Sequence, residues 1–115
     1  MKDVFRDIVG MDGIRGAVLL SFDGTILFED YQESTAPPFE VKHREGLLAA
    51  LDGVRETDAL YQDGRIYIRR SEIGFLLVTM SATASVAMLR LNCDILLPSL
   101  KATAQPKGLK RFFRK

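Results

Sequence analysis

The side chains that can do covalent or metal chemistry are few in this chain of 115 residues. Its one histidine, His43, stands in a charged stretch with no nucleophile motif nearby, which is typical of a solvated helix residue. Its one cysteine, Cys93, lies among leucines, where a thiol is buried and unreactive. A single cysteine also excludes an intramolecular disulfide and a cysteine-rich zinc site. We therefore predict no catalytic residue and no metal ligand.

The glycines do not form a phosphate-binding loop. Gly10, Gly13 and Gly16 are spaced by three, but they precede an apolar run, whereas a phosphate loop follows its strand. No Gly-Lys-Ser or Gly-Lys-Thr motif is present. We therefore expect no nucleotide cofactor. The remaining candidate metal ligands are acids in turns, where carboxylates satisfy backbone donors: Asp12, Asp23 and Asp63.

Composition predicts one globular domain with a short basic end. Hydrophobic residues make up 47% and charged residues 27%, and 115 residues fit one core. The formal net charge of +1 excludes a wholly basic nucleic-acid binder. Residues 102–115 hold five cations and no acid, so we divide the chain into a domain over 1–101 and a flexible basic tail over 102–115. With no signal-peptide pattern and no apolar run of membrane-spanning length, we expect the cytoplasm.

Cations alternate with aromatic residues near the end of the tail. Lys110, Arg111, Phe112 and Phe113 are the candidate contact residues. Such a segment is a solubilising end, a contact for an anionic membrane or an acidic partner, or a nucleic-acid contact. Nucleic acid is the least favoured of these, and five cations attract any of these partners only weakly at physiological salt.

The first third of the chain predicts a helix followed by a hairpin. Residues 2–9 follow helical periodicity, and residues 16–22 form an apolar run typical of a strand buried on both faces. Asp23-Gly24 is a two-residue hairpin turn that leads into a strand over 25–31. In that strand we expect Ile26 and Phe28 on one face and Leu27 on the other.

The rest of the chain predicts a helix, three strands and a last helix. The second helix covers 39–51, the strands 56–62, 65–70 and 75–80, and Ser81 or Thr83 caps the last helix before Pro98 ends it. Leu91 and Ile95 belong to the broad apolar face of that helix. The strand over 75–80 is apolar on both faces, like that over 16–22, so we expect both to be central and the second and third strands to be the edges. In the fourth strand we expect Tyr67 on the wetter face. The predicted class is α+β, with a five-stranded antiparallel sheet flanked by helices on both faces in the order α-β-β-α-β-β-β-α.

Two features predict a homodimer. The third strand lies at a sheet edge and carries no proline or lysine to prevent strand addition. Gly46 in the second helix would let another helix approach closely, although it could instead pack on its own sheet. A two-fold axis would use both features at once. The candidate interface residues are Gly46, Leu47, Asp58, Ala59, Leu60 and Tyr61.

A family resemblance rests on features in a fixed order: the residues over 13–21, the Asp23-Gly24 turn followed by Ile26-Leu27, the Asp63-Gly64 turn, and the strand over 74–80 that leads into a long last helix. Through these features the chain resembles the Roadblock/dynein light chain family across about residues 2–100. The resemblance implies a Roadblock-like, profilin-like fold and a homodimer in which the third strands pair. It also implies a non-enzymatic partner or regulator of a small Ras-like GTPase. No catalytic residue is carried over, and the basic tail is outside the family pattern.

We therefore expect a dimeric GTPase regulator that acts by binding one nucleotide state more tightly. The alternative is a dimeric scaffold or adaptor, attached by its tail to a membrane or an acidic partner. A small-ligand sensor is disfavoured, because no convergent polar groups in an apolar setting are visible. The candidate partner surface lies on the second helix and comprises Arg44, Glu45, Leu48 and Asp52.

Overall fold

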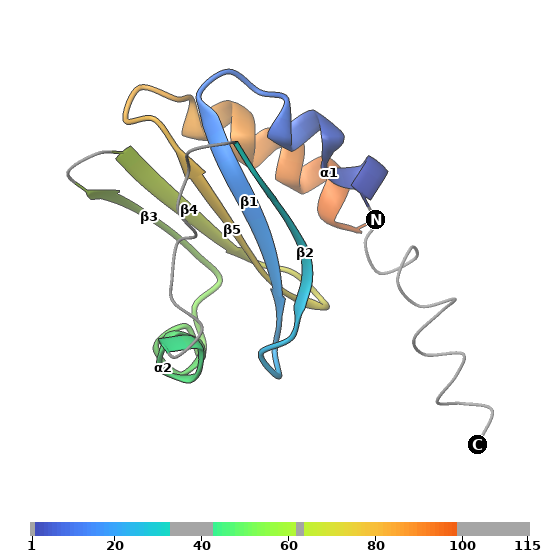
Figure 1. Ribbon diagram of the computed structural model, residues 1–115, viewed down its shortest axis with the longest axis vertical. Helices are drawn as coiled ribbons and strands as arrows, with labels where there is room; N and C mark the ends of the chain where they lie inside the picture. Colours follow the sequence, from blue (N-terminus) through green and yellow to red (C-terminus); the bar gives the residue numbers. More distant parts are fainter. Residues whose placement is uncertain (1, 33–42, 62–63, 99–115) are drawn as a thin grey trace.

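The computed structural model describes residues 2–32, 43–61 and 64–98, and within them the predicted order of elements is confirmed (Figure 1). The predicted strand boundaries are right to within about two residues wherever the chain is described. The elements are α1 (Lys2–Val9), β1 (Ile14–Ser21), β2 (Ile26–Tyr31), α2 (Arg44–Ala50), β3 (Glu56–Tyr61), β4 (Gly64–Arg70), β5 (Gly74–Met80) and a last helix over residues 86–98.

The five strands form one antiparallel sheet in the order β2-β1-β5-β4-β3. The two most apolar strands, β1 and β5, pair with each other near the centre, and every residue of β5 is buried. A strand covered on both faces needs apolar side chains in both directions, which explains these runs. The edges are β2 and β3, as predicted.

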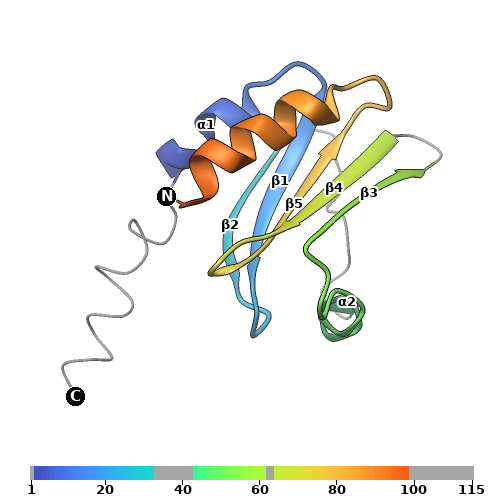
Figure 2. The ribbon, with the colours of Figure 1, turned by 180° about the vertical axis from the view of Figure 1, so that it is seen from behind.

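Helices lie on both sides of the sheet, although α2 lies only near one end of its side (Figure 2). On one face, α1 and the last helix lie side by side, and their core includes Phe5, Leu19, Tyr67 and Leu89. We call this the helix-pair face. On the other face, α2 lies beside a smaller core that includes Leu51. We call this the α2 face. Side chains that alternate along β1 and β5 fill the two cores in turn.

A β-bulge divides the apolar side chains of β2 between the two faces. Leu19 pairs with Phe28, but Leu20 pairs with Ile26, so Leu27 is the extra residue. Phe28 stacks on Phe5 of α1 with ring centroids 4.5 Å apart, whereas Ile26 packs on the α2 face. The prediction that Ile26 and Phe28 share a face is therefore wrong, because a bulge shifts the alternation by one residue.

The first hairpin turn is held by its own side chains. The Thr25 amide donates to Ser21 Oγ at 3.0 Å and to Asp23 Oδ1 at 3.1 Å, and Gly24 has φ of +96°. Hydrogen bonds from Ser21 and Thr25 lower the pKa of the Asp23 carboxyl. An acid followed by a glycine is what this turn requires.

The last helix begins later than predicted. Its first residue is Val86, and Ser85 rather than Ser81 or Thr83 caps it, with the Met88 amide donating to Ser85 Oγ at 3.2 Å. Residues 82–84 form a turn instead, and Ala84 lies beside Gly13, just before β1 begins. Leu91 and Ile95, expected on the buried face, are 51% and 64% exposed.

Three predicted segments extend past the described residues, one of which is the end of the third strand at residue 62 together with Asp63 of the second hairpin turn. The second helix was expected from 39, and α2 begins at Arg44, with 39–42 outside the described residues. The tail over 102–115, with Lys110, Arg111, Phe112 and Phe113, also lies outside them. Among the helices that the structure describes, none has the length and apolarity needed to cross a membrane.

Candidate functional site

The outer edge of β3 has no partner strand within the described part of the chain. The strand pairs only with β4, and Asp58, Ala59 and Leu60 are all exposed. Leu60 is 64% exposed, which is unusual for a leucine in a regular strand. Asp58 forms an ion pair with Arg65 of β4, with Oδ1 and Nε 3.0 Å apart. A straight edge of unpaired amides and carbonyls accepts another strand. The side chain of Tyr61, the sixth candidate in this group, lies outside the description.

Helix α2 contributes no buried residue of its own. Leu47 and Leu48 pack against the α2-face core but stay partly exposed, and only Leu51, just after the helix, is buried. A Cβ built on Gly46 would meet nothing within 4 Å. Packing of Gly46 on its own sheet is therefore not found. An amphipathic helix gains its stability mainly from the face it buries, and α2 buries little.

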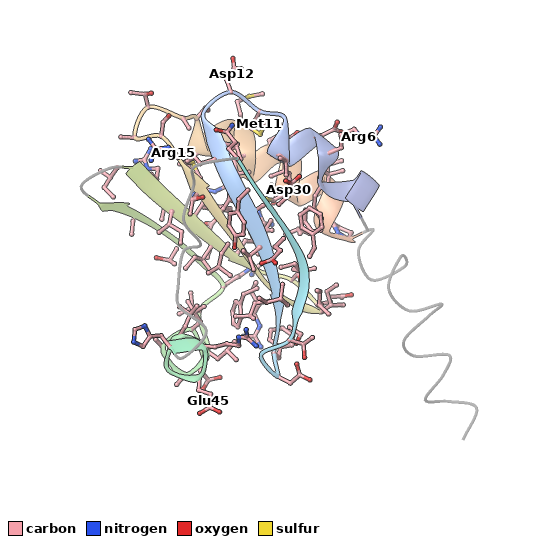
Figure 3. All side chains as sticks on the ribbon, viewed as in Figure 1. Arg6, Met11, Asp12, Arg15, Asp30 and Glu45 are labelled. Atoms are coloured by element: carbon pink, nitrogen blue, oxygen red, sulfur yellow. The ribbon has the colours of Figure 1, made fainter. Side chains whose placement is uncertain are left out.

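The four candidate partner residues of α2 fall into two pairs. Arg44 and Leu48 point toward the β1–β2 turn, where their carbons lie 3.2 and 3.6 Å from a Cβ built on Gly24. Glu45 and Asp52 are exposed, and Glu45 points away from the sheet (Figure 3). The second pair is thus accessible to a partner, while the first pair positions the helix.

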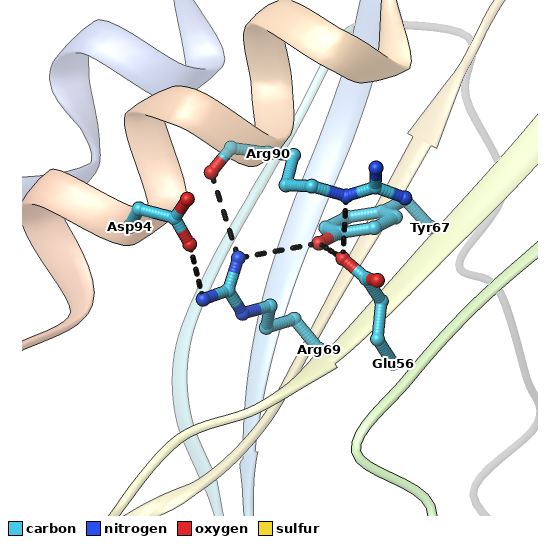
Figure 4. A network of polar contacts seen from close by, with 5 residues as sticks. All are labelled: Glu56, Tyr67, Arg69, Arg90 and Asp94. Carbon is cyan, nitrogen blue, oxygen red and sulfur yellow. Dashed lines mark hydrogen bonds and ion pairs between the residues drawn. The ribbon is translucent and has the colours of Figure 1, made fainter.

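A polar network ties β3 to the last helix across β4 (Figure 4). Arg90 Nε donates to Glu56 Oε2 at 2.8 Å, and the Tyr67 hydroxyl donates to the same oxygen. Arg69 forms an ion pair with Asp94 and donates to the Tyr67 hydroxyl and to the Arg90 carbonyl, each at 3.5 Å. The five side chains therefore hold the first residue of the edge strand at a defined position.

The electrostatics of the network favour an ionised Glu56 and a neutral Tyr67. The hydrogen bond from Tyr67, supported by Arg90, lowers the pKa of Glu56 below its usual 4.5. Burial, together with the hydrogen bond to Glu56, raises the pKa of Tyr67 from 10.0 to about 12. Tyr67 is fully buried, contrary to the prediction of a wetter face, because the last helix covers this side of β4.

Sequence reasoning missed this network. The Arg90 and Asp94 spacing of four residues, which places both charges on one helix side, was the available signal. Nothing in the sequence indicated that Glu56 and Arg69 would pair with them, because that contact depends on which strand lies beneath the helix.

The two residues considered for catalysis or metal binding, Cys93 and His43, lie on different elements. Cys93 is buried, and burial raises the pKa of its thiol to about 11, so little thiolate forms at neutral pH. His43 is exposed just before α2. In residues 2–32, 43–61 and 64–98 no three acids, histidines or cysteines come together as metal ligands do. The surfaces described above are suited to contacts with macromolecules.

Solved structures share this arrangement at low sequence identity. A structure of MglB with a tetrameric arrangement matches with a TM-score of 0.72 and 14% identity, covering 91% of this chain and 88% of that chain. The gliding protein MglB from Thermus thermophilus matches at 0.70 and 16%, with the same coverage. A Roadblock/LC7 domain from Streptomyces avermitilis matches at 0.61 and 16%, covering 90% and 92%.

MglC from Myxococcus xanthus is also similar, with a TM-score of 0.57 and 18% identity over 87% of this chain and 98% of that chain. No family model matches the sequence. No curated protein matches it either. The chain has the Roadblock/LC7 fold, as the sequence resemblance implied.

Proposed function

We propose that this chain, with its Roadblock/LC7 fold, is a non-enzymatic homodimer in the cytoplasm that binds and regulates a small Ras-like GTPase. The observation that carries the proposal is the joint exposure of the β3 edge and of α2. They are consecutive elements of the sequence, and in the described protomer β3 pairs on one side only and α2 has no buried residue. The shared fold with MglB and MglC supports the proposal.

In the proposed dimer, the β3 strands of two protomers pair and join their sheets into one. Asp58, Ala59 and Leu60 are the exposed edge residues that would lie at the join, and Tyr61 extends the strand. Pairing at a two-fold axis uses the same patch twice and also brings the two α2 helices together. Gly46 and Leu47 would face the partner helix, where the open space at Gly46 accommodates it.

The paired α2 helices then form one surface from two protomers. Glu45 and Asp52 supply exposed acids to it, and Arg44 and Leu48 hold each helix against the β1–β2 turn. Regulation follows if this surface binds one nucleotide state of the GTPase more tightly, because differential affinity alone shifts a two-state equilibrium.

The dimer is tested by solution mass in the micromolar range, where we expect twice 12.9 kDa. Leu60→Lys places a charge on the β3 edge and is expected to weaken dimerisation at least about tenfold. Leu27→Lys on the opposite edge strand is the matched control, since Leu27 is also an exposed leucine, and it should leave the mass unchanged. A monomeric parent chain would contradict the proposal.

Regulation is tested by titrating the dimer with a Ras-like GTPase from the same genome, loaded with GDP or with a non-hydrolysable GTP analogue. We expect one state to bind at least about tenfold more tightly. The Glu45→Lys/Asp52→Lys variant should lose this complex and remain a dimer. Equal affinity for both states, or no complex together with unchanged GTP hydrolysis, would leave the scaffold alternative in its place.

A further inference from the structure

An arginine and an exposed aromatic ring meet at the β1–β2 turn, which spans residues 22–25. Phe22 is 42% exposed, and its ring packs at 88° to the buried ring of Phe75, with centroids 5.3 Å apart. The guanidinium carbon of Arg70, the last residue of β4, lies 4.7 Å from the centroid of Phe22 and 5.4 Å from that of Phe75. Because a guanidinium is attracted to aromatic faces, the two rings orient Arg70 before any partner binds. We call Phe22 and Arg70 the turn cluster.

The charge of Arg70 has no counter-ion among the described residues. The ion pairs within residues 2–32, 43–61 and 64–98 join Asp58, Asp94 and Glu56 to other arginines. Arg70 itself is exposed. A guanidinium carries its N–H donors in its plane, so a ring that covers one face leaves those donors available. Arg70 therefore presents an oriented pair of donors that matches the two oxygens of a carboxylate.

A second arginine approaches the same turn from α2. Arg44 Cδ lies 3.2 Å from a Cβ built on Gly24, and within the described part of the chain its Nε is buried without a hydrogen-bond partner. Leu48 lies beside Gly24 as well, and it packs on the α2-face core to which Phe75 belongs. Figures 1 and 2 both show α2 and the β1–β2 turn at the same end of the sheet. The turn cluster is therefore continuous with the α2 face.

We propose that the turn cluster, with Arg44 beside it, receives an acidic side chain of the GTPase, an inference that rests on the proposed function. The carboxylate would accept hydrogen bonds from Arg70, and apolar groups around it would cover Phe22. Aromatic and arginine side chains supply much of the binding energy of protein interfaces. A free anion such as phosphate would pair with the cations and leave Phe22 in water, so a protein segment fits the cluster better.

The same partner would meet cations at the turn and acids at Glu45 and Asp52 of α2. Opposite charges at two places on one surface fix the orientation in which a partner docks. The turn cluster thus gives the α2 surface a direction that a uniformly acidic helix pair would lack.

The test compares variants for binding to the Ras-like GTPase in the nucleotide state that the parent chain favours. Arg70→Gln removes the charge and should raise the dissociation constant at least about tenfold. Arg70→Lys keeps the charge without the planar pair of donors, and it should raise the constant at least about threefold. Between about 0.1 and 0.5 M salt, the constant of the parent should rise more steeply than that of Arg70→Gln.

Phe22→Ala should also weaken the complex about tenfold or more. The matched controls are Arg6→Gln on α1 and Leu91→Ala on the last helix, because both remove an exposed side chain from the opposite face of the sheet. Both should bind as the parent does. Unchanged circular dichroism and solution mass verify that each variant is folded and assembled as the parent is.

Two results would overturn the inference in different ways. If the parent binds the GTPase and Arg70→Gln binds equally well, the turn cluster is not a contact and the proposed function stands. If the parent forms no complex in either nucleotide state, the inference falls together with the proposed function.

Discussion

Arg90 Nε and Glu56 Oε2 lie 2.8 Å apart, which joins the last helix to the first residue of the edge strand across 34 positions of sequence. Glu56 accepts a second hydrogen bond from the buried Tyr67 on the same oxygen. Through this pair, the last helix and the strand that carries the proposed dimer edge are joined to each other.

Glu56 accepts hydrogen bonds from both Arg90 and Tyr67, and replacing it should make the free energy of unfolding depend less on pH in the acidic range. We expect Glu56→Gln to reduce the free energy of unfolding by about 1 kcal/mol at pH 7, since the group is partly exposed and screened. The pKa of Glu56 is lowered in the fold, so its contribution is present above 4.5 and is lost as pH falls through the lowered value. Urea unfolding at pH 7 and below pH 4 measures this difference.

Asp52→Asn, which neutralises an exposed acid of no such network, is the control and should differ little from the parent at either pH. A gap between parent and Glu56→Gln that grows on acidification would contradict the assigned role of the carboxylate.

Two substitutions at Gly46 test the stability of α2 and the association of protomers separately. Nothing lies within 4 Å of a Cβ at this position, so Gly46→Ala should stabilise the helix by up to about 1 kcal/mol. Gly46→Leu should fold equally well yet raise the dimer dissociation constant at least about tenfold, because the larger side chain fills the crossing of the two helices. Analytical ultracentrifugation measures the dimer dissociation constant of both variants. Equal constants would show that Gly46 does not lie in the interface.

Gly74 stands where the β4–β5 connection touches β1. A Cβ there would lie 2.2 Å from the Leu20 carbonyl oxygen, and the residue has φ of +156°. Gly74→Ala should therefore cost about 2–4 kcal/mol, because backbone rather than a side chain must move. Gly53 also has a positive φ, but a Cβ there would meet nothing within 4 Å. Gly53→Ala should therefore lower the free energy of unfolding by only about 1 kcal/mol. Thermal unfolding that ranks the two in the opposite order would contradict the close approach.

Cys93 should resist thiol reagents in the folded protein. Burial raises the pKa of its thiol to about 11, so both access and ionisation are suppressed at pH 8. We expect labelling by a disulfide reagent to be at least about a hundredfold slower than in urea-unfolded chain. Stoichiometric labelling of native protein within the mixing time would show that the last helix opens readily.

The sequence was most informative where local chemistry decides the structure. Asp23-Gly24 predicted a turn because glycine adopts the positive φ that the position requires, and the run over Phe75–Met80 predicted a central strand because both faces are apolar. The edge position of β3 followed from placing the strands that are apolar on both faces, β1 and β5, in the interior of the sheet. These signals each depend on a few neighbouring residues.

The missed features depend on contacts between distant segments. The bulge at Leu27 arises from how β2 aligns with β1, and alternation within β2 alone cannot reveal it. The covering of Tyr67 depends on where the last helix lies. Leu91 and Ile95 were assigned to the core because they are apolar. The buried side of the helix is instead formed by Leu89, Cys93 and Leu97.

Because of the bulge at Leu27, the two margins of the sheet, β2 and β3, differ in how readily they can pair with another strand. The register of the β2 margin is interrupted by the bulge, whereas β3 pairs with β4 without a register shift. If both margins were regular, protomers would add end to end without limit and form fibrils. With only one regular margin per protomer, the proposed pairing of β3 strands would end at two protomers.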